Sequence, residues 1–97
     1  MALTIAQLRA FTAVAEHGSI RAASRALGIA QSGITQQLQH LESMLGATLF
    51  TRTNRGIALT ALGQRLLQRA GAILGECERA EQEVRDLNAS LQARLQE

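Results

Sequence analysis

The chain places hydrophobic residues three or four positions apart in three successive segments, and a glycine follows each segment. This spacing predicts amphipathic helices, and glycine commonly lies directly after the last residue of a helix. Thr4 and Gln7 fit a capping box for the first helix, and Ser19 can cap the second. We therefore expect three helices, at about residues 5–17, 20–27 and 31–45.

The third predicted helix separates its apolar and polar residues onto opposite faces. The apolar stripe is formed by Ile34, Leu38, Leu41 and Leu45. The polar face carries amide and hydroxyl side chains, at Gln31, Ser32, Thr35, Gln36 and Gln39. Two short helices joined by a glycine-marked turn make a helix-turn-helix, whose second helix can enter the major groove of DNA. Glutamine can bond two positions on adenine and threonine suits thymine, but an ordinary solvated helix face fits the same pattern equally well.

The hydrophobic period changes after the third helix. Residues 47–52 and 57–59 favour β-structure and flank a turn at 53–56, in which Asn54 and Gly56 can take positive φ angles. Two strands this short are not stable alone. We therefore expect a hairpin that packs on the helices.

Arg52 and Arg55 flank the tip of the predicted hairpin, directly after the candidate recognition helix. In that place the hairpin would form a wing, whose arginines could neutralise DNA phosphates or enter a minor groove. A charged loop that keeps the protein in solution is the alternative. The position beside a candidate recognition helix favours the wing.

A fourth helix is predicted from its N-cap, Thr60, to the end of the chain. Its seam residues are spaced alternately three and four apart, at Gly63, Leu66, Ala70, Ile73, Cys77, Ala80, Val84, Leu87 and Leu91. Such a heptad seam is typical of paired helices, and beyond Ile73 it would lie exposed in a single chain. We therefore expect a homodimer with a palindromic binding site. Its interface would contain Ile73, Cys77, Ala80, Val84, Leu87 and Leu91.

Charge is distributed unevenly along the chain. All ten basic residues are arginine. Up to residue 75, seven arginines stand against two glutamates, a net charge of +5, whereas the remaining residues carry three arginines and six acids, a net charge of −3. The basic first part is therefore expected to meet a polyanion, and the acidic last part is not.

Few residues suggest other chemistry. Cys77 is the only cysteine, which excludes an internal disulfide and favours a small apolar role in the seam. His17 and His40 are isolated, so we expect no metal site and no cofactor. No nucleophile and base are paired in the sequence, and an enzyme is not expected.

The sequence shows neither a signal peptide nor an apolar run of about 20 residues that could span a membrane, which favours a location in the cytoplasm.

Several blocks of the sequence match a known family in their order. They are Leu8–Phe11, Val14–Ile20, Ala22-Ala23, Ala30–Leu38, Leu41-Glu42, Leu45-Gly46, Leu49-Phe50, Arg52-Thr53 and Leu59–Gly63. Over about residues 5–67 they resemble the start of a LysR-type transcriptional regulator, without a gap. The heptad seam that follows resembles the linker helix of that family.

The resemblance implies a mainly α fold, a winged helix-turn-helix of three helices and a two-stranded wing, followed by a long dimerisation helix. Such a protein would bind promoter DNA as a dimer, with recognition helix 31–45 in the major groove and wing 50–59 at the flanking minor groove. Its linker helices would pair antiparallel, and the full-length protein could assemble into a tetramer. By position, the residues facing bases would be Gln31, Thr35 and Gln36. The residues holding the DNA backbone or minor groove would be Ser32, Arg52, Thr53 and Arg55.

Two positions depart from the family pattern, which usually has serine at position 30 and proline at position 32. This chain has Ala30 and Ser32 instead, and we expect Ser32 to bond a backbone N–H or a phosphate where the helix starts. The family also continues into a two-lobed effector-binding domain that this chain lacks. We therefore expect a fragment with a DNA-binding head at 1–60 and a linker helix at 61–97.

Sequence-specific DNA binding is the leading hypothesis, and a coiled-coil interaction module, whose small head binds another protein, is the second. The two functions differ in the role of Arg52 and Arg55. If the head binds DNA through these arginines, its affinity will fall steeply with salt and with their removal.

Overall fold

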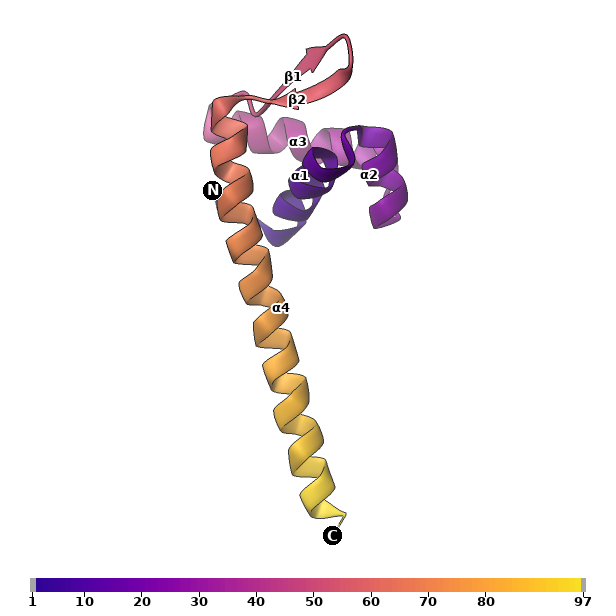
Figure 1. Ribbon diagram of the computed structural model, residues 1–97, viewed down its shortest axis with the longest axis vertical. Coiled ribbons are helices and arrows are strands. Elements are labelled where there is room, and N and C mark those ends of the chain that lie inside the picture. The colour runs from indigo at the N-terminus through magenta and orange to yellow at the C-terminus, as the bar shows by residue number, and fades with distance from the viewer. Residues whose placement is uncertain (1, 97) are drawn as a thin grey trace.

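The computed structural model describes residues 2–96. Four helices and a hairpin follow one another in the order α1 (Ile5–His17), α2 (Ile20–Leu27), α3 (Gln31–Leu45), β1 (Phe50–Thr53), β2 (Gly56–Leu59) and α4 (Ala61–Leu95). The first three helices and the hairpin form a head, and α4 starts against this head and projects from it as a rod (Figure 1). The molecule is consequently 62 Å long but only 25 × 22 Å across. The mainly α, winged architecture expected from the sequence is confirmed.

Local hydrogen bonds set the helix ends at the predicted positions. The capping box of α1 forms, because the N–H of Thr4 donates to Oε1 of Gln7 and the N–H of Gln7 donates to Oγ1 of Thr4. The hydroxyls of Ser19 and Thr60 each accept a backbone N–H in the first turns of α2 and α4. The first three helices are each followed by a glycine in the left-handed conformation: Gly18, Gly28 and Gly46.

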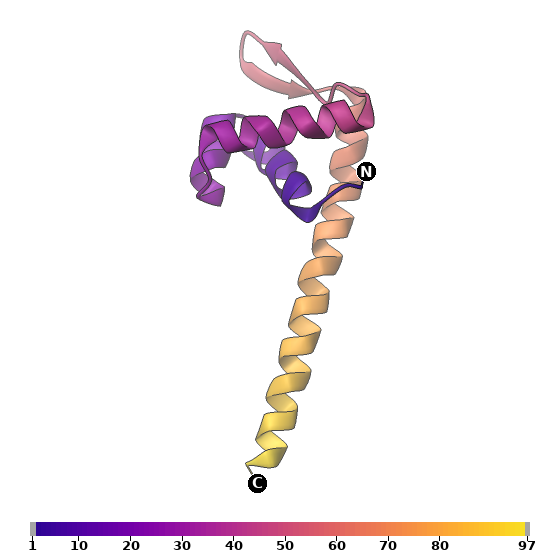
Figure 2. The same cartoon turned by 180° about the vertical axis from the view of Figure 1, so that it is seen from behind.

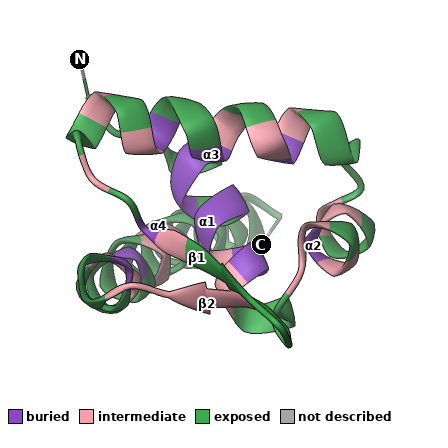
Figure 3. Cartoon of the chain, turned by 90° about the horizontal axis from the view of Figure 1, so that it is seen from above, coloured by how far each residue is buried: buried purple, intermediate pink, exposed green. Residues whose placement is uncertain are grey.

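The hydrophobic core forms around α1, which contacts α2, α3 and α4 (Figure 3). Leu8, Phe11 and Val14 of α1 are almost fully buried. The rings of Phe11 and Phe50 lie 5.3 Å apart between centroids, so the start of the hairpin packs directly on the central helix. The two aromatic residues of the chain therefore join the helices to the hairpin.

The apolar stripe of α3 is buried over three of its four predicted positions, Ile34, Leu38 and Leu41. Leu45, the fourth, is 42% exposed, and the half-buried Met44 packs on the core in its place. The prediction for Leu45 is wrong because this residue ends the helix.

The hairpin is antiparallel, with Phe50 opposite Leu59. Its first strand starts three residues later than predicted, because residues 48–49 bond to α3 and to the N-cap of α4 instead of to the second strand. Of the two turn residues predicted to take positive φ, only Gly56 does, with φ 120°. The prediction for Asn54 is wrong, because the glycine after the two-residue loop takes the unusual conformation.

The first turns of α4 belong to the head. Gly63 and Ala70 are buried there, and the same part of the helix packs Leu66, Leu67 and Leu74 on the core. Every residue from 78 to 96, in contrast, is exposed. Within residues 2–96, no helix combines the length and the apolar character that crossing a membrane requires.

Candidate nucleic-acid interface

The polar face of α3 lies on the outside of the head, directed away from α1 (Figure 3). Gln31, Ser32 and Gln36 are exposed, and Thr35 is half-buried. Since an α-helix turns by about 100° per residue, Thr35 and Gln36 lie toward opposite edges of this face. Gln39, between these edges, is exposed as well. The face predicted to meet bases is therefore available to another molecule along the first three turns of α3.

The start of α3 has no side-chain cap. Ala30 is the N-cap residue, and its carbonyl oxygen accepts the N–H groups of Gly33 and Ile34 at 3.0 and 3.2 Å. The prediction that Ser32 bonds a backbone N–H is wrong, because Ala30 holds the N-cap position and Ser32 lies two residues beyond it, inside the helix. Ser32 remains exposed at the start of the polar face.

A groove runs between α3, the start of α2 and the hairpin, which we call the wing (Phe50–Leu59). This groove brings the two predicted sets of residues together, since Gln31 and Thr35 of α3 line it with Arg52 and Thr53 of the wing. The third side of the groove, where α2 starts, was not expected from the sequence. That side is formed by Gly18, Ser19 and Ile20.

A second groove continues along α3 and places Glu42 beside the wing. It is lined on the α3 side by Thr35, Gln39 and Glu42, and on the wing side by Thr51 and Arg52. The α3 residues share one side of the helix because they are spaced four and three apart. That spacing was the signal that could have added Glu42 to the site. Two wing residues, Arg52 and Ile57, line both grooves, and Arg52 is the charged one of the two.

The tip of the wing is shaped by the side chain of Thr53. Its hydroxyl donates to the carbonyl of Gly56 at 3.3 Å and accepts the N–H of Arg55 at 3.2 Å. Arg55 itself is exposed in the two-residue loop. The hydroxyl of Thr53 therefore fixes the backbone from which the Arg55 side chain projects.

The base of the wing is anchored to helices on both of its sides. On the α3 side, Oε2 of Glu42 accepts the N–H of Leu49 at 2.6 Å and that of Phe50 at 3.4 Å. On the α4 side, the N–H of Thr60 donates to the carbonyl of Leu49 at 3.0 Å, and its hydroxyl donates to the carbonyl of Thr48 at 2.7 Å. Because the side chain of Leu49 is also buried in the core, this residue is a shared anchor for α3, the wing and α4.

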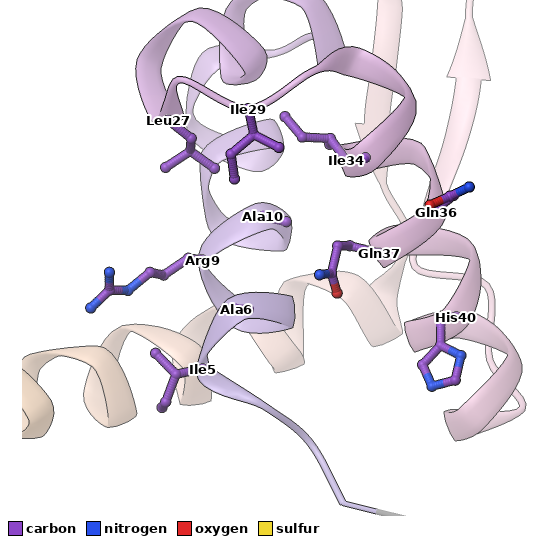
Figure 4. Close-up of a pocket in the computed structure, with 11 residues that line it drawn as sticks. Ile5, Ala6, Arg9, Ala10, Leu27, Ile29, Ile34, Gln36, Gln37 and His40 are labelled. Carbon is purple, nitrogen blue, oxygen red and sulfur yellow. The ribbon is translucent and has the colours of Figure 1, made fainter.

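The other edge of the polar face borders a hollow between α1 and α3 (Figure 4). Gln36, Gln37 and His40 line it from α3, and Ile5 and Arg9 line it from α1. Gln36 therefore lies on the side of α3 opposite the wing, whereas Gln31 and Thr35 lie on the wing side. The three residues predicted to face bases span the whole width of the face.

The arginines of the head have no carboxylate partners within residues 2–96. Ion pairs in this range are confined to α4, where Arg79 pairs with Glu76 and Arg85 pairs with Glu81 at 3.3 Å. The head arginines are all exposed. They are Arg9, Arg21, Arg25, Arg52 and Arg55, followed by Arg65 and Arg69 on the first turns of α4. An excess of unpaired positive charge of this kind attracts polyanions.

Within residues 2–96, no three His, Cys, Asp or Glu side chains lie close enough together to hold a metal ion.

The predicted seam of α4 is exposed along its outer half. Val84, Leu87 and Leu91 are 66%, 58% and 58% exposed. Closer to the head, Cys77 is half-buried and Ala80 is exposed, while Ile73 is 38% exposed. From Ala80 onward the seam is therefore exposed, on the part of α4 that projects from the head (Figure 2).

The sequence of this chain is similar to those of bacterial transcription regulators. The family model for bacterial regulatory helix-turn-helix proteins of the lysR family matches residues 5–64. The HTH-type transcriptional regulator PtxR of Pseudomonas aeruginosa is 45% identical over 93 residues, which cover 96% of this chain and 30% of PtxR. The regulator ClcR of Pseudomonas putida is 54% identical over 68 residues, covering 70% of this chain and 23% of ClcR. This chain thus spans less than a third of the length of these two curated relatives, both of which are transcriptional regulators.

Solved structures agree with the sequence comparison. The DNA-binding domain of CbnR, in a complex with DNA, matches with a TM-score of 0.78 and 42% identity, over 86% of this chain and 95% of that chain. The BenM DNA-binding domain, in a complex with catB site 1 DNA, matches with a TM-score of 0.84 and 30% identity, over 88% of this chain and 96% of that chain. Full-length CbnR, a LysR family regulator, matches with a TM-score of 0.80 over 29% of its length.

Proposed function

The chain belongs to the lysR family of bacterial regulatory helix-turn-helix proteins, and from this premise we propose that it is the DNA-reading part of a longer transcription regulator. The observation that carries the proposal is the groove in which α3 residues Gln31 and Thr35 lie together with wing residue Arg52. One surface there combines amide and hydroxyl groups that can read bases with a guanidinium group that can hold phosphates.

We assign base recognition to α3 and place this helix in the major groove. Gln31, Thr35 and Gln36 span the polar face from the wing side to the far side and so can reach several base pairs. The amide of glutamine suits adenine, and the methyl and hydroxyl groups of threonine suit thymine. Gln39, exposed on the same face, is a further candidate one turn on from Thr35.

The wing residues serve affinity more than specificity. Arg52 and Arg55 are exposed and unpaired within residues 2–96, so they can neutralise phosphates or enter the flanking minor groove. Ser32, exposed at the start of α3, can donate its hydroxyl to a phosphate. Thr53 contributes through the loop, because its hydroxyl already bonds Arg55 and Gly56.

We further propose that two copies pair through α4. Burying the exposed seam from residue 73 to residue 91 against a second copy would stabilise a dimer at roughly 25 cal/mol per Å2 of apolar surface. In this proposal the head at 1–60 reads DNA and the helix at 61–97 dimerises, with antiparallel pairing and a palindromic site as the family resemblance implies. The regulator would work in the cytoplasm, and the full-length protein could assemble further into a tetramer.

Selection of bound sequences from a pool of random duplexes tests this function. The expected result is enrichment of a motif with two inverted half-sites, whose centres are spaced by about one or more helical turns of 10–10.5 base pairs. A pool that stays random after repeated rounds, while the protein remains folded and dimeric, would favour the protein-binding interaction module instead.

A further inference from the structure

We propose that Glu42 is a positioning residue for DNA binding: its carboxylate fastens the base of the wing to the recognition helix and so holds Arg52 beside the base-reading face. This inference rests on the proposed function and adds a residue to it. Glu42 lies on the same side of α3 as Thr35, two turns further along. Its side chain bonds backbone N–H groups at the base of the wing, and its favourable effect on DNA binding acts through the residues that it positions.

The hydrogen bonds of Glu42 fix the backbone where the wing begins. Its Oε2 accepts the N–H of Leu49 at 2.6 Å and, more weakly at 3.4 Å, that of Phe50. Both bonds are charge-assisted, since the acceptor is a carboxylate. Because Arg52 follows Leu49 by only three residues along an extended strand, a shift at Leu49 is carried directly to Arg52.

Within residues 2–96, Glu42 supplies the side-chain hydrogen bonds that join α3 to the base of the wing. The hairpin has two strands of four residues, which are not independently stable. Thr60 fastens its base from the α4 side, through bonds to the carbonyls of Thr48 and Leu49. Glu42 supplies the bonds to backbone N–H groups from the α3 side, and thereby holds together the two walls of the groove that Thr35 and Arg52 line.

The charge of Glu42 makes a purely solvating role a poor explanation. It is one of only two acidic residues among the first 75 residues of the chain, and it lines a groove beside the proposed DNA surface. A carboxylate in that place repels phosphates and lowers affinity. The bonds to Leu49 and Phe50 offset this repulsion, because they position a wing that carries two arginines.

The test compares three substitutions at Glu42 in two ways. Glu42→Ala removes the acceptor, Glu42→Asp shortens its reach, and Glu42→Gln keeps an oxygen acceptor of the same length without the charge. Glu16→Ala is the matched control, because Glu16 is the other acid of the head and lies exposed on α1. The first measurement is amide hydrogen exchange at Leu49 and Phe50 in the free protein. The second is affinity for the selected duplex, in the parent protein and in the Arg52→Ala/Arg55→Ala background.

We expect Glu42→Ala and Glu42→Asp to accelerate exchange at Leu49 by about tenfold or more, and to weaken DNA binding by a similar factor. Glu42→Gln should retain slow exchange and bind DNA at least as well as the parent protein. In the background without the wing arginines, Glu42→Ala should cost almost nothing further, because the wing then has no charge to position.

Three other outcomes would overturn either the positioning role of Glu42 or the proposed function. Unchanged exchange at Leu49 in Glu42→Asp overturns the positioning role, even if Glu42→Ala fails to fold. Equal losses of affinity in the two backgrounds overturn it as well, since Glu42 would then act independently of the wing arginines. Failure of the parent protein to bind any duplex, with slow exchange at Leu49 retained, overturns the proposed function and not the contact itself.

Discussion

Gly63 of α4 packs directly against the backbone carbonyl of Leu49, at a place where even a methyl group has no room. A Cβ added at Gly63 would overlap the Leu49 oxygen and would also lie 2.9 Å from a methyl carbon of Leu59. Since the Leu49 carbonyl is backbone and is bonded to Thr60, it cannot move away without breaking the anchor of the wing. The close approach of α4 to the wing therefore requires glycine at this position.

Gly63→Ala is expected to lower the free energy of unfolding by about 3 kcal/mol, the upper part of the usual cost of overpacking. Urea denaturation followed by circular dichroism measures this change. Gly71→Ala is the matched control, because Gly71 lies in the same helix with no atom within 4 Å of an added Cβ. The control should raise stability by about 0.5–1 kcal/mol through the better helix propensity of alanine. Equal effects of the two substitutions would show that the contact with Leu49 does not matter.

Thr53 is expected to act on DNA affinity through the loop that carries Arg55. Thr53→Val removes the hydroxyl that bonds Gly56 and Arg55 but keeps the branched shape. Affinity for all duplexes should therefore fall by about fivefold, which corresponds to a loss of about 1 kcal/mol for these two exposed bonds together. Thr53→Ser keeps the hydroxyl and should stay near the parent value. Fluorescence anisotropy with a labelled duplex measures both. An equal loss in the serine variant would point to the methyl group instead.

Substitutions of base-reading residues and of phosphate-holding residues are expected to change DNA binding in different ways. Gln31→Ala or Thr35→Ala should alter sequence preference, costing about 1–3 kcal/mol on the selected duplex and little on random DNA. Arg55→Ala should weaken binding to both duplexes alike and reduce the slope of log affinity against log salt by about one. Titrations at several salt concentrations separate these patterns. Similar losses on both duplexes for every variant would contradict the assignment.

The outer seam of α4 is expected to hold the dimer together. Val84→Asp or Leu87→Asp places a charge in a stripe that is more than half exposed in the single chain, and should yield monomers because an unpaired charge cannot be buried against a second copy. Ala89→Asp, on the opposite side of the same helix, is the control and should leave the dimer intact. Sedimentation velocity reports the mass. A dimer that persists in both seam variants would exclude the seam as the interface.

Much of the fold could be predicted from the sequence because its signals are local. The cap at Thr4 and the glycine at position 18 act within a few residues, and the ends of α1 lie where they were expected. The start of the wing could not be predicted in this way. Leu49 has the hydrophobic character of a strand residue, but its N–H bonds Glu42 of a different helix, and a propensity argument contains no information about such a partner.

The candidate site, too, could be predicted from the sequence only where its signals are local. The polar face of α3 follows from helical spacing, and Gln31, Thr35 and Arg52 were expected at the surface from the sequence alone. The role of Glu42 required the structure, because its spacing from Thr35 gives a shared face but not a bond to the wing. The cap expected from Ser32 failed for a related reason: which residue takes the N-cap position depends on how the preceding turn enters the helix.

In the proposed function, α3 and the wing together read a specific DNA sequence. The most direct test is the affinity of the purified protein for the selected duplex and for a scrambled duplex of the same composition, measured at one physiological salt concentration. The proposed function predicts that the selected duplex binds at least about 1,000-fold more tightly. Equal affinity for the two duplexes would contradict it.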